Sequence, residues 1–203
     1  MLNFSPNLNI EIDVEELKNK ISNYVTLSPE DLDFATGFYK KKSLAKNEIL
    51  IQPGQFVKHW YFVEKGCLCF YSLKDGNEKV LEFFSENDFF TDIYSYLKEK
   101  PSNVYFRATE PTTILYITKD DVQKSYDHSH QIERWGRLAM QDTFIQTYRR
   151  VAHLNYLSNE ERYLRLIEER PNLLQRVPQY MIASYLGLTP VGLSKIRKRL
   201  SLM

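Results

Sequence analysis

Hydrophobic and polar positions change their period twice along the 203-residue chain. In residues 10–35 apolar positions recur every three or four residues, as in amphipathic helices, and Ser28 with Pro29 resembles a helix start. From about Phe38 short runs rich in β-branched and aromatic residues replace that pattern. After Asp120 the helical period returns and persists to the C-terminus. This order of helices, strands and helices predicts an α+β protein.

Six short runs make up the predicted β-region, and turn-forming residues close most of them. Several short strands at near-regular spacing, with Gly or Asn at the corners, are typical of a sandwich or barrel. The best hairpin signal is Asp75-Gly76-Asn77, because Asp-Gly tolerates the positive φ of a tight turn. The runs are 48–51, 60–63, 67–73, 80–84, 104–108 and 114–118.

A long amphipathic helix of about 25 residues is predicted after the β-region, against a usual length of about 11–12. Asp142 interrupts its apolar stripe, and the stripe needs a cover. We expect a second copy of the chain to provide it; the alternative is packing on the helix's own β-region only. The stripe consists of Ile132, Trp135, Leu138, Ala139, Ile145, Tyr148, Val151 and Ala152.

Composition points to a folded protein, with 43% hydrophobic and 14% aromatic residues. No apolar run approaches the ~18 residues that cross a bilayer, and the N-terminus lacks the pattern of a secretion signal. Cys67 and Cys69 fall on one face of a strand and are expected to be buried thiols, since two cysteines cannot close a zinc or iron–sulfur site. These features predict a cytosolic protein without a cofactor.

Nothing in the sequence has the spacing of a catalytic site. No Gly-rich phosphate loop is present. Four histidines are scattered without ligand or triad spacing: His59, His128, His130 and His153. We therefore expect no enzymatic activity.

Charge is distributed unevenly behind a net value of +1. Residues 158–203 carry eight Lys or Arg and four Glu, a net charge of +4, whereas the other residues carry 19 basic and 22 acidic side chains, a net charge of −3. From Pro190 onward there are four cations and no acid. This asymmetry indicates a tail that faces nucleic acid.

Residues 177–200 have the pattern of two short helices joined by a turn. Gly187 stands where a tight turn needs a left-handed residue, Thr189 can cap the second helix, and Pro190 fits its first position. In a helix-turn-helix the second helix enters the major groove, while its cations meet phosphates. The alternative is a helical hairpin with a solvated basic face. The outward residues of the second helix are Val191, Ser194, Lys195, Lys198 and Arg199.

The segments in this order resemble the Crp/Fnr transcription regulators over nearly the whole chain. "IASYLGLTPVGLSKIRKRL" is similar to the family's recognition unit, particularly that of short members from Bacteroidetes, and "NEILIQPGQFVKHWYFVEKGCLCFY" is similar to its cyclic-nucleotide-binding domain. The resemblance implies a double-stranded β-helix (jelly-roll-like) sensor domain over residues 1–125, a dimerisation helix over 126–157 and a helix-turn-helix domain over 158–203.

The same resemblance implies a homodimer that reads a two-fold site in double-stranded DNA through helix 190–200. It assigns Thr189, Pro190, Val191 and Lys195 to the base-reading end of that helix. Two departures are visible. Val191 replaces an acidic residue common in the family, and no β-hairpin wing follows before Met203.

The family's phosphate-binding cassette is altered in this chain. A Phe-Gly-Glu followed by Arg-Ser/Thr-Ala corresponds here to Phe90-Thr91-Asp92 and then Ser102-Asn103-Val104. Ser102 stands at the position of the phosphate-binding Arg, and loss of such a contact costs roughly a thousandfold in affinity. We therefore expect weak or no binding of cyclic AMP.

Alternatives to a cyclic-nucleotide sensor stay open. The domain could respond to an unidentified small molecule or act only as a scaffold. Arg107 lies outside the cassette and is expected in a surface or interdomain ion pair. The competing hypothesis for the function of the whole chain is a ligand-binding module whose helical tail contacts protein rather than DNA.

Overall fold

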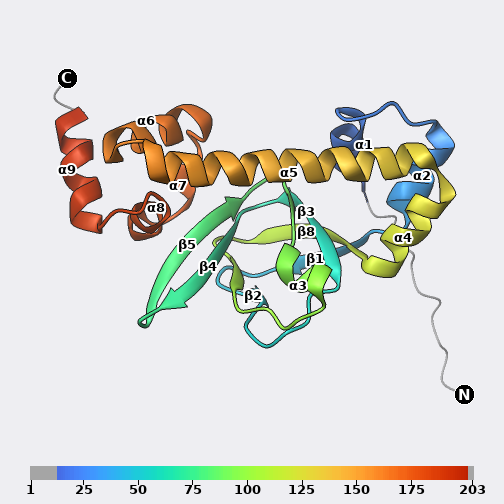
Figure 1. Cartoon of the computed structure of the whole chain (residues 1–203), viewed down its shortest axis with the longest axis horizontal. Helices are drawn as coiled ribbons and strands as arrows, with labels where there is room; N and C mark the ends of the chain where they lie inside the picture. The colour runs from blue at the N-terminus through green and yellow to red at the C-terminus, as the bar shows by residue number, and fades with distance from the viewer. Residues whose placement is uncertain (1–12, 201–203) are drawn as a thin grey trace, which may run out of the picture.

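The computed structural model describes residues 13–200, which form two facing antiparallel sheets with helices on both outer faces (Figure 1). The first sheet has the strand order β1-β8-β3-β6 and the second β2-β7-β4-β5. The strands of the first sheet are β1 (Lys40–Leu44), β8 (Thr112–Thr118), β3 (His59–Lys65) and β6 (Phe89–Phe90). Those of the second are β2 (Ile49–Ile51), β7 (Tyr105–Ala108), β4 (Leu68–Lys74) and β5 (Asn77–Phe84).

Alternating residues of several strands serve two different cores. On β6, Phe90 joins the core between the sheets, whereas Phe89 packs on the outer face of the first sheet. The inner core is built from both sheets by Leu44, Ile51, Tyr61, Val63, Leu68, Phe90, Phe106 and Ile114, among others. This arrangement is the two-sheet, jelly-roll-like architecture that the strand pattern predicts.

Helices that precede and follow the strands in the chain cover the outer face of the first sheet. They are α1 (Glu15–Ser22), α2 (Pro29–Gly37), α4 (Lys119–His128) and the first half of α5 (His130–Tyr156). The shared core contains Leu17, Ile21, Phe62, Leu115 and Ile117. The short α3 (Ile93–Lys98) follows β6.

Four further helices follow α5. They are α6 (Asn159–Glu169), α7 (Leu173–Arg176), α8 (Gln179–Tyr185) and α9 (Pro190–Leu200). Among them α8 lies against β5 at the edge of the second sheet. The core of these helices includes Cys69, Tyr71, Val80 and Phe83 of β4 and β5, together with Cys67 just before β4. The C-terminal helices and the sandwich therefore share one hydrophobic core.

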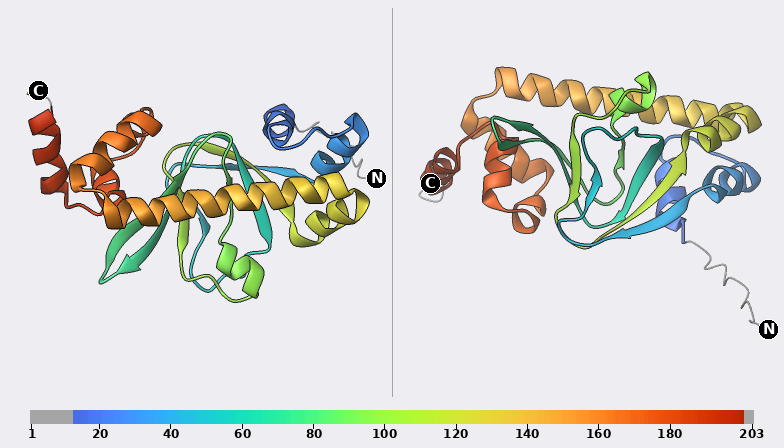
Figure 2. Two further views of the ribbon diagram at one scale, coloured as in Figure 1. Left: turned by 45° about the horizontal axis from the view of Figure 1, so that its top comes forward. Right: turned by 90° about the horizontal axis from the view of Figure 1, so that it is seen from below.

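Helix α5 runs along the long axis of the molecule and connects its two helical ends (Figure 1). Figure 2 shows the same relation from two other directions. Its 27 residues begin after Ser129, whose side chain accepts from the backbone N–H of Gln131. Ser129 is extended, with φ −150° and ψ 127°, so α4 and α5 are separate helices. The predicted long helix is confirmed, and its separation from α4 was not expected.

Two local predictions are confirmed. Ser28 caps α2 by accepting from the backbone N–H of Asp31 at 3.1 Å. The β4–β5 hairpin turns at Asp75 and Gly76, with φ of 53° and 75°. The first positions of the predicted helical segment 10–35, up to residue 12, and the chain end at Met203 lie outside the described residues. None of the helices within residues 13–200 is both long and apolar enough to cross a membrane.

Candidate functional site

The turn between α8 and α9 has the conformation expected at Gly187. Its φ is +70°, the N–H of Leu188 donates to the carbonyl of Ala183 at 2.8 Å, and the N–H of Gly187 donates to that of Ser184 at 3.0 Å. This pair of bonds is a Schellman motif, which closes the C-terminus of α8. A Cβ at Gly187 would meet only Leu154 Cδ2, at 3.6 Å. Backbone conformation, rather than lack of space, therefore requires glycine here.

Helix α9 begins immediately after this turn. The Thr189 Oγ1 accepts from the backbone N–H of Gly192 at 3.0 Å, and Pro190 is the first helical residue. Leu193 and Ile196 are buried against α8. The cap, the proline and the two apolar residues orient α9 and leave its other face free of the core.

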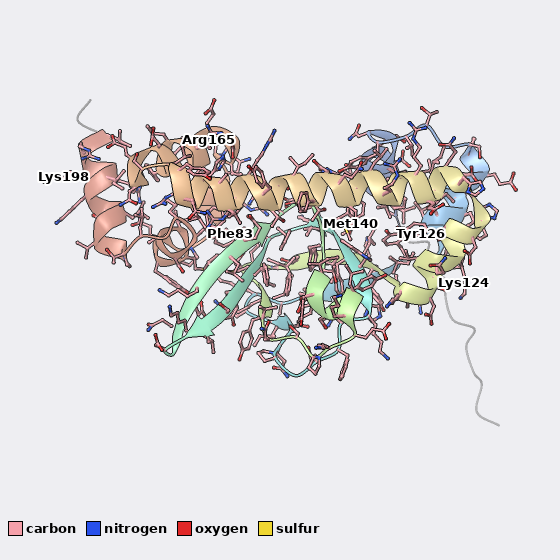
Figure 3. The ribbon with its side chains drawn as sticks, viewed as in Figure 1. Phe83, Lys124, Tyr126, Met140, Arg165 and Lys198 are labelled. Carbon is pink, nitrogen blue, oxygen red and sulfur yellow. The ribbon has the colours of Figure 1, made fainter. Side chains whose placement is uncertain are left out.

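All seven residues predicted to contact DNA are exposed, and Val191 is 66% exposed. Four cations and no acid occur between Pro190 and Leu200. The Arg199 guanidinium pairs with Glu160 on α6. Figure 3 shows Lys198 on α9 at one end of the molecule. The exposed residues are Thr189, Pro190, Val191, Ser194, Lys195, Lys198 and Arg199.

Ser184 on α8 joins the C-terminal helices to strand β5. Its Oγ accepts from the N–H of Val80 at 3.0 Å and donates to the carbonyl of Glu78 at 3.0 Å. One hydroxyl thereby satisfies a donor and an acceptor on the outer edge of the second sheet, where β5 has no neighbouring strand.

Two arginines strengthen this interface. Arg170 donates from Nη1 to Glu82 at 2.8 Å and to the carbonyl of Phe83 at 3.0 Å. Arg176 binds both carboxylate oxygens of Glu86, at 2.7 and 2.9 Å, and also contacts Glu110. These hydrogen bonds raise the pKa of Arg176 further above its ordinary value. The orientation of the C-terminal helices is thus tied to the β-sandwich by directional contacts.

Helix α5 takes part in the same interface through Arg150. The Arg150 guanidinium lies 3.7 Å from the ring centroid of Tyr185 and donates to the Tyr185 carbonyl. Its Nε donates to the carbonyl of Leu81 on β5 at 3.4 Å. Arg150 therefore connects α5, α8 and the second sheet, a link that the sequence pattern did not indicate.

Cys67 and Cys69 are buried as free thiols in the core beneath the C-terminal helices, which confirms their predicted role. Burial raises the pKa of Cys67 to about 11 and also raises that of Cys69. Among the described residues, no group of three or more His, Cys, Asp or Glu could hold a metal ion.

The cassette residues are engaged by the protein's own backbone. Thr91 donates to the carbonyl of His59 at 2.8 Å, and Asp92 caps α3 by accepting from the N–H of Ser95 at 3.2 Å. Ser102 is buried and accepts from the N–H of Val104 at 3.2 Å, whereas Asn103 is exposed. The predicted pocket residues lie close along the chain, and these contacts engage the side-chain oxygens of Thr91, Asp92 and Ser102 locally.

Aromatic rings fill much of the space between the sheets, a feature that the sequence pattern had not indicated. Phe90 stacks on Tyr61, Phe84 and Phe106 with centroid distances of 5.0, 5.2 and 5.5 Å. Phe70 stacks on Phe106 at 4.6 Å. These aromatic residues alternate with outward-facing residues along the strands, and that alternation is the sequence signal from which their inward position could have been predicted. Phe90 is therefore part of the packed core.

Arg107 lies on the opposite face of the second sheet from this aromatic core. Its guanidinium pairs with both carboxylate oxygens of Glu78, at 2.6 and 2.8 Å, and lies 4.8 Å from the ring centroid of Tyr71. The expected ion pair is confirmed. Arg107 is thus directed away from the core between the sheets, toward Glu78 and Tyr71.

The apolar stripe of α5 is divided between two environments. Ile132 and Trp135 are buried in the core over the first sheet, and Leu138 and Ala139 pack against that core. Ile132 and Trp135 were predicted to face a partner and are instead buried in the chain's own core, because the first half of α5 lies directly over the sheet. The half-buried Leu138 and Ala139, by contrast, keep part of their surface exposed.

The second half of α5 is exposed. Ile145, Tyr148 and Val151 are 48%, 65% and 53% exposed, and Phe144, which was not among the predicted stripe residues, is 72% exposed. Phe144 follows the same helical spacing as Tyr148 and Val151. Only this half of the stripe offers an uncovered apolar face.

Comparisons with known proteins agree with this architecture. Residues 41–129, which include most of the sandwich, match the profile of the cyclic nucleotide-binding domain. No curated protein matches the chain.

Several solved regulators have a similar fold. FixK2 from Bradyrhizobium japonicum is 19% identical, with a TM-score of 0.70 over 81% of this chain and 85% of that chain. CLP, described as a c-di-GMP responsive global regulator in Xanthomonas campestris, is 15% identical. Its TM-score is 0.67, over 86% of this chain and 92% of that chain. The catabolite activator protein of Thermus thermophilus is 18% identical. Its TM-score is 0.55, over 90% of this chain and 86% of that chain. The chain therefore shares the fold of these solved proteins.

Proposed function

We propose that this protein is a DNA-binding transcription regulator of the Crp/Fnr type that acts as a homodimer and catalyses no reaction. The observation that carries the proposal is helix α9, which presents an exposed cationic face at one end of the molecule. A match of most of the chain to the fold of known regulators supports it.

Helix α9 has the properties of a recognition helix. Its N-terminal residues are small or apolar and exposed, so they can approach base edges, with Val191 available for contact with a thymine methyl group. Lys195, Lys198 and Arg199 follow and would meet phosphates. Attachment through Ser184, Arg170 and Arg176 would hold the helix in one orientation while it binds.

A second copy of the chain would cover the exposed half of α5. Phe144, Tyr148 and Val151 recur at intervals of four and three, which is the spacing of a two-helix seam. A two-fold axis along this seam would bring two α9 helices onto one DNA molecule, where half-sites lie about 34 Å apart. The resulting units are the sensor domain, the dimer helix and the DNA-binding domain over residues 1–125, 126–157 and 158–203.

The competing function is a ligand-binding module whose C-terminal helices contact another protein. The exposed Val191 and Tyr180 favour that alternative, because they add apolar surface to the cationic end of the molecule. Salt dependence separates the two functions, since phosphate contacts release counterions and contacts with apolar protein surface do not.

DNA binding can be measured by fluorescence anisotropy with a labelled duplex of mixed sequence. We expect binding at low salt and a fall in affinity on the order of a thousandfold from about 50 to 200 mM salt, for six or more phosphate contacts. Lys195→Gln should reduce the slope of log affinity against log salt by about one, because it removes one cation that meets a phosphate. The matched control is Lys46→Gln, an exposed lysine of the sandwich. Absence of binding at low salt would favour the protein-contacting module.

A further inference from the structure

A cavity of about 390 Å³ lies between the outer face of the first sheet and the helices above it. Trp60, Phe89 and Ile117 form its floor, on β3, β6 and β8. Helices α3, α4 and α5 form the walls, and Figure 3 labels two of the wall residues, Tyr126 and Met140. The volume falls within the range of sites for small molecules.

This cavity is separate from the cassette. None of the cassette residues, Phe90 to Asp92 and Ser102 to Asn103, lines it. Phe90 points into the core between the sheets, whereas its neighbour Phe89 lines the cavity on the other face. A molecule bound here would therefore lie outside the sandwich.

The lining is mainly aromatic and aliphatic, and one buried donor stands out. Trp135 on α5 is only 8% exposed, and its indole N–H has no acceptor among the described residues. A buried donor without a partner is costly. A ligand acceptor in the cavity would supply the partner that the described part of the chain lacks.

Gly136 allows the wall to form next to this donor. A Cβ at Gly136 would lie 2.1 Å from the Tyr126 Oη, so the phenol of Tyr126 packs directly against the backbone of α5. The close approach brings α4 and α5 into contact, and both residues, Gly136 and Tyr126, line the cavity. Two adjacent residues of α5 thus contribute a donor and a contact point for α4.

We propose that this cavity binds a small, uncharged and mainly apolar molecule with a carbonyl or hydroxyl oxygen that accepts from the Trp135 indole. Binding itself is independent of DNA. Its regulatory consequence rests on the proposed function: the ligand would contact the first half of α5, and unequal affinity for two positions of that helix would shift the spacing of the two α9 helices.

The test uses the full chain and 2-acetylnaphthalene, an aromatic ketone that quenches tryptophan emission by energy transfer. Both tryptophans of the chain, Trp60 and Trp135, line the cavity, so the emission reports on this site. Two variants fill the cavity from α5, Ala139→Phe and the milder Thr143→Met, at half-buried positions. Gln131→Phe adds the same ring on the exposed surface of α5.

We expect saturable quenching in the unmodified protein and in Gln131→Phe, and its loss in Ala139→Phe and Thr143→Met. Trp135→Phe should weaken binding about tenfold, because it removes the donor and keeps an aromatic ring. Absence of quenching in the unmodified protein, or unchanged affinity in folded Thr143→Met, would overturn the site. Unchanged affinity in Trp135→Phe would overturn the role of the indole donor.

The regulatory step is tested by repeating the DNA titration with saturating ketone. A change of about fivefold or more in DNA affinity supports coupling, and an unchanged affinity overturns it. If the ketone binds and no DNA binds at low salt, the cavity proposal stands and the proposed function fails. If DNA binds and the ketone does not, the proposed function stands and the cavity proposal fails.

Discussion

Gly187 joins the two C-terminal helices in a backbone conformation that other L-amino acids adopt at a cost. Its φ of +70° lies in the left-handed region, and the open space around it means that strain alone opposes a side chain. The orientation of α9 therefore depends on one residue without a side chain.

Gly187→Ala should lower the free energy of unfolding by about 1–2 kcal/mol, the usual cost of the left-handed conformation. Denaturant unfolding followed by circular dichroism measures this change. The control is Gly37→Ala at the end of α2, where an added Cβ meets nothing within 4 Å and φ is not positive. The control should be neutral or stabilising. Equal stability of the two variants would contradict the argument.

At the scale of elements, α5 combines two functions along one helix. Its first half completes the core over the first sheet, and its second half leaves an apolar face in solvent. Because an exposed face of this kind is costly in water, we attribute it to self-association.

Tyr148→Lys should shift the protein from dimer to monomer, because a lysine in the seam places a charge between two apolar helices. Analytical ultracentrifugation would then give a mass near the 24.1 kDa of one chain rather than twice that value. The control is Gln146→Lys, two positions along and on the opposite side of α5 by helical spacing. A dimer that survives Tyr148→Lys would exclude this seam.

The cassette yields a second prediction at this scale. Calorimetric titration with cyclic AMP or cyclic GMP should show no micromolar binding, because Ser102 supplies no cation and Phe90 belongs to a stacked aromatic core. The titration of unmodified protein is sufficient, and micromolar binding of either nucleotide would refute the prediction.

At the scale of the whole molecule, ion pairs attach the C-terminal helices to the sandwich. Burial raises the pKa of Glu86, but hydrogen bonds from Arg176 and from the N–H of Gly66 outweigh it and leave the pKa below its ordinary value. A carboxyl with a depressed pKa in the folded state stabilises that state above its unfolded pKa, and the contribution disappears as pH falls through the folded value.

Stability should therefore fall as the pH drops below about 4.5, and Arg176→Gln should make this loss smaller. Unfolding measured by denaturant at a series of pH values checks both statements. Arg165→Gln is the control, because its pair with Glu169 lies within α6 and is exposed. An identical pH profile for Arg176→Gln and the unmodified protein would rule out this contribution.

Sequence patterns predicted most strands and missed those without an apolar alternation. Strand β1 reads Lys40-Lys41-Lys42-Ser43-Leu44, and only Leu44 is buried, because an edge strand pairs on one side and exposes the other residues. The two-residue β6 and the short α3 were also too brief to show a period. Such elements form because their neighbours pair with them or cover them.

Local chemistry in the sequence was sufficient for the Gly187 turn, the Thr189 cap, the Asp75-Gly76 hairpin and the cationic face of α9, because each depends on residues adjacent in the chain. Tertiary structure alone decided which half of the α5 stripe is covered, which aromatic rings fill the sandwich and where the Trp135 cavity lies. Those features arise where segments distant in sequence pack together, and the spacing of residues along one segment does not specify its neighbours.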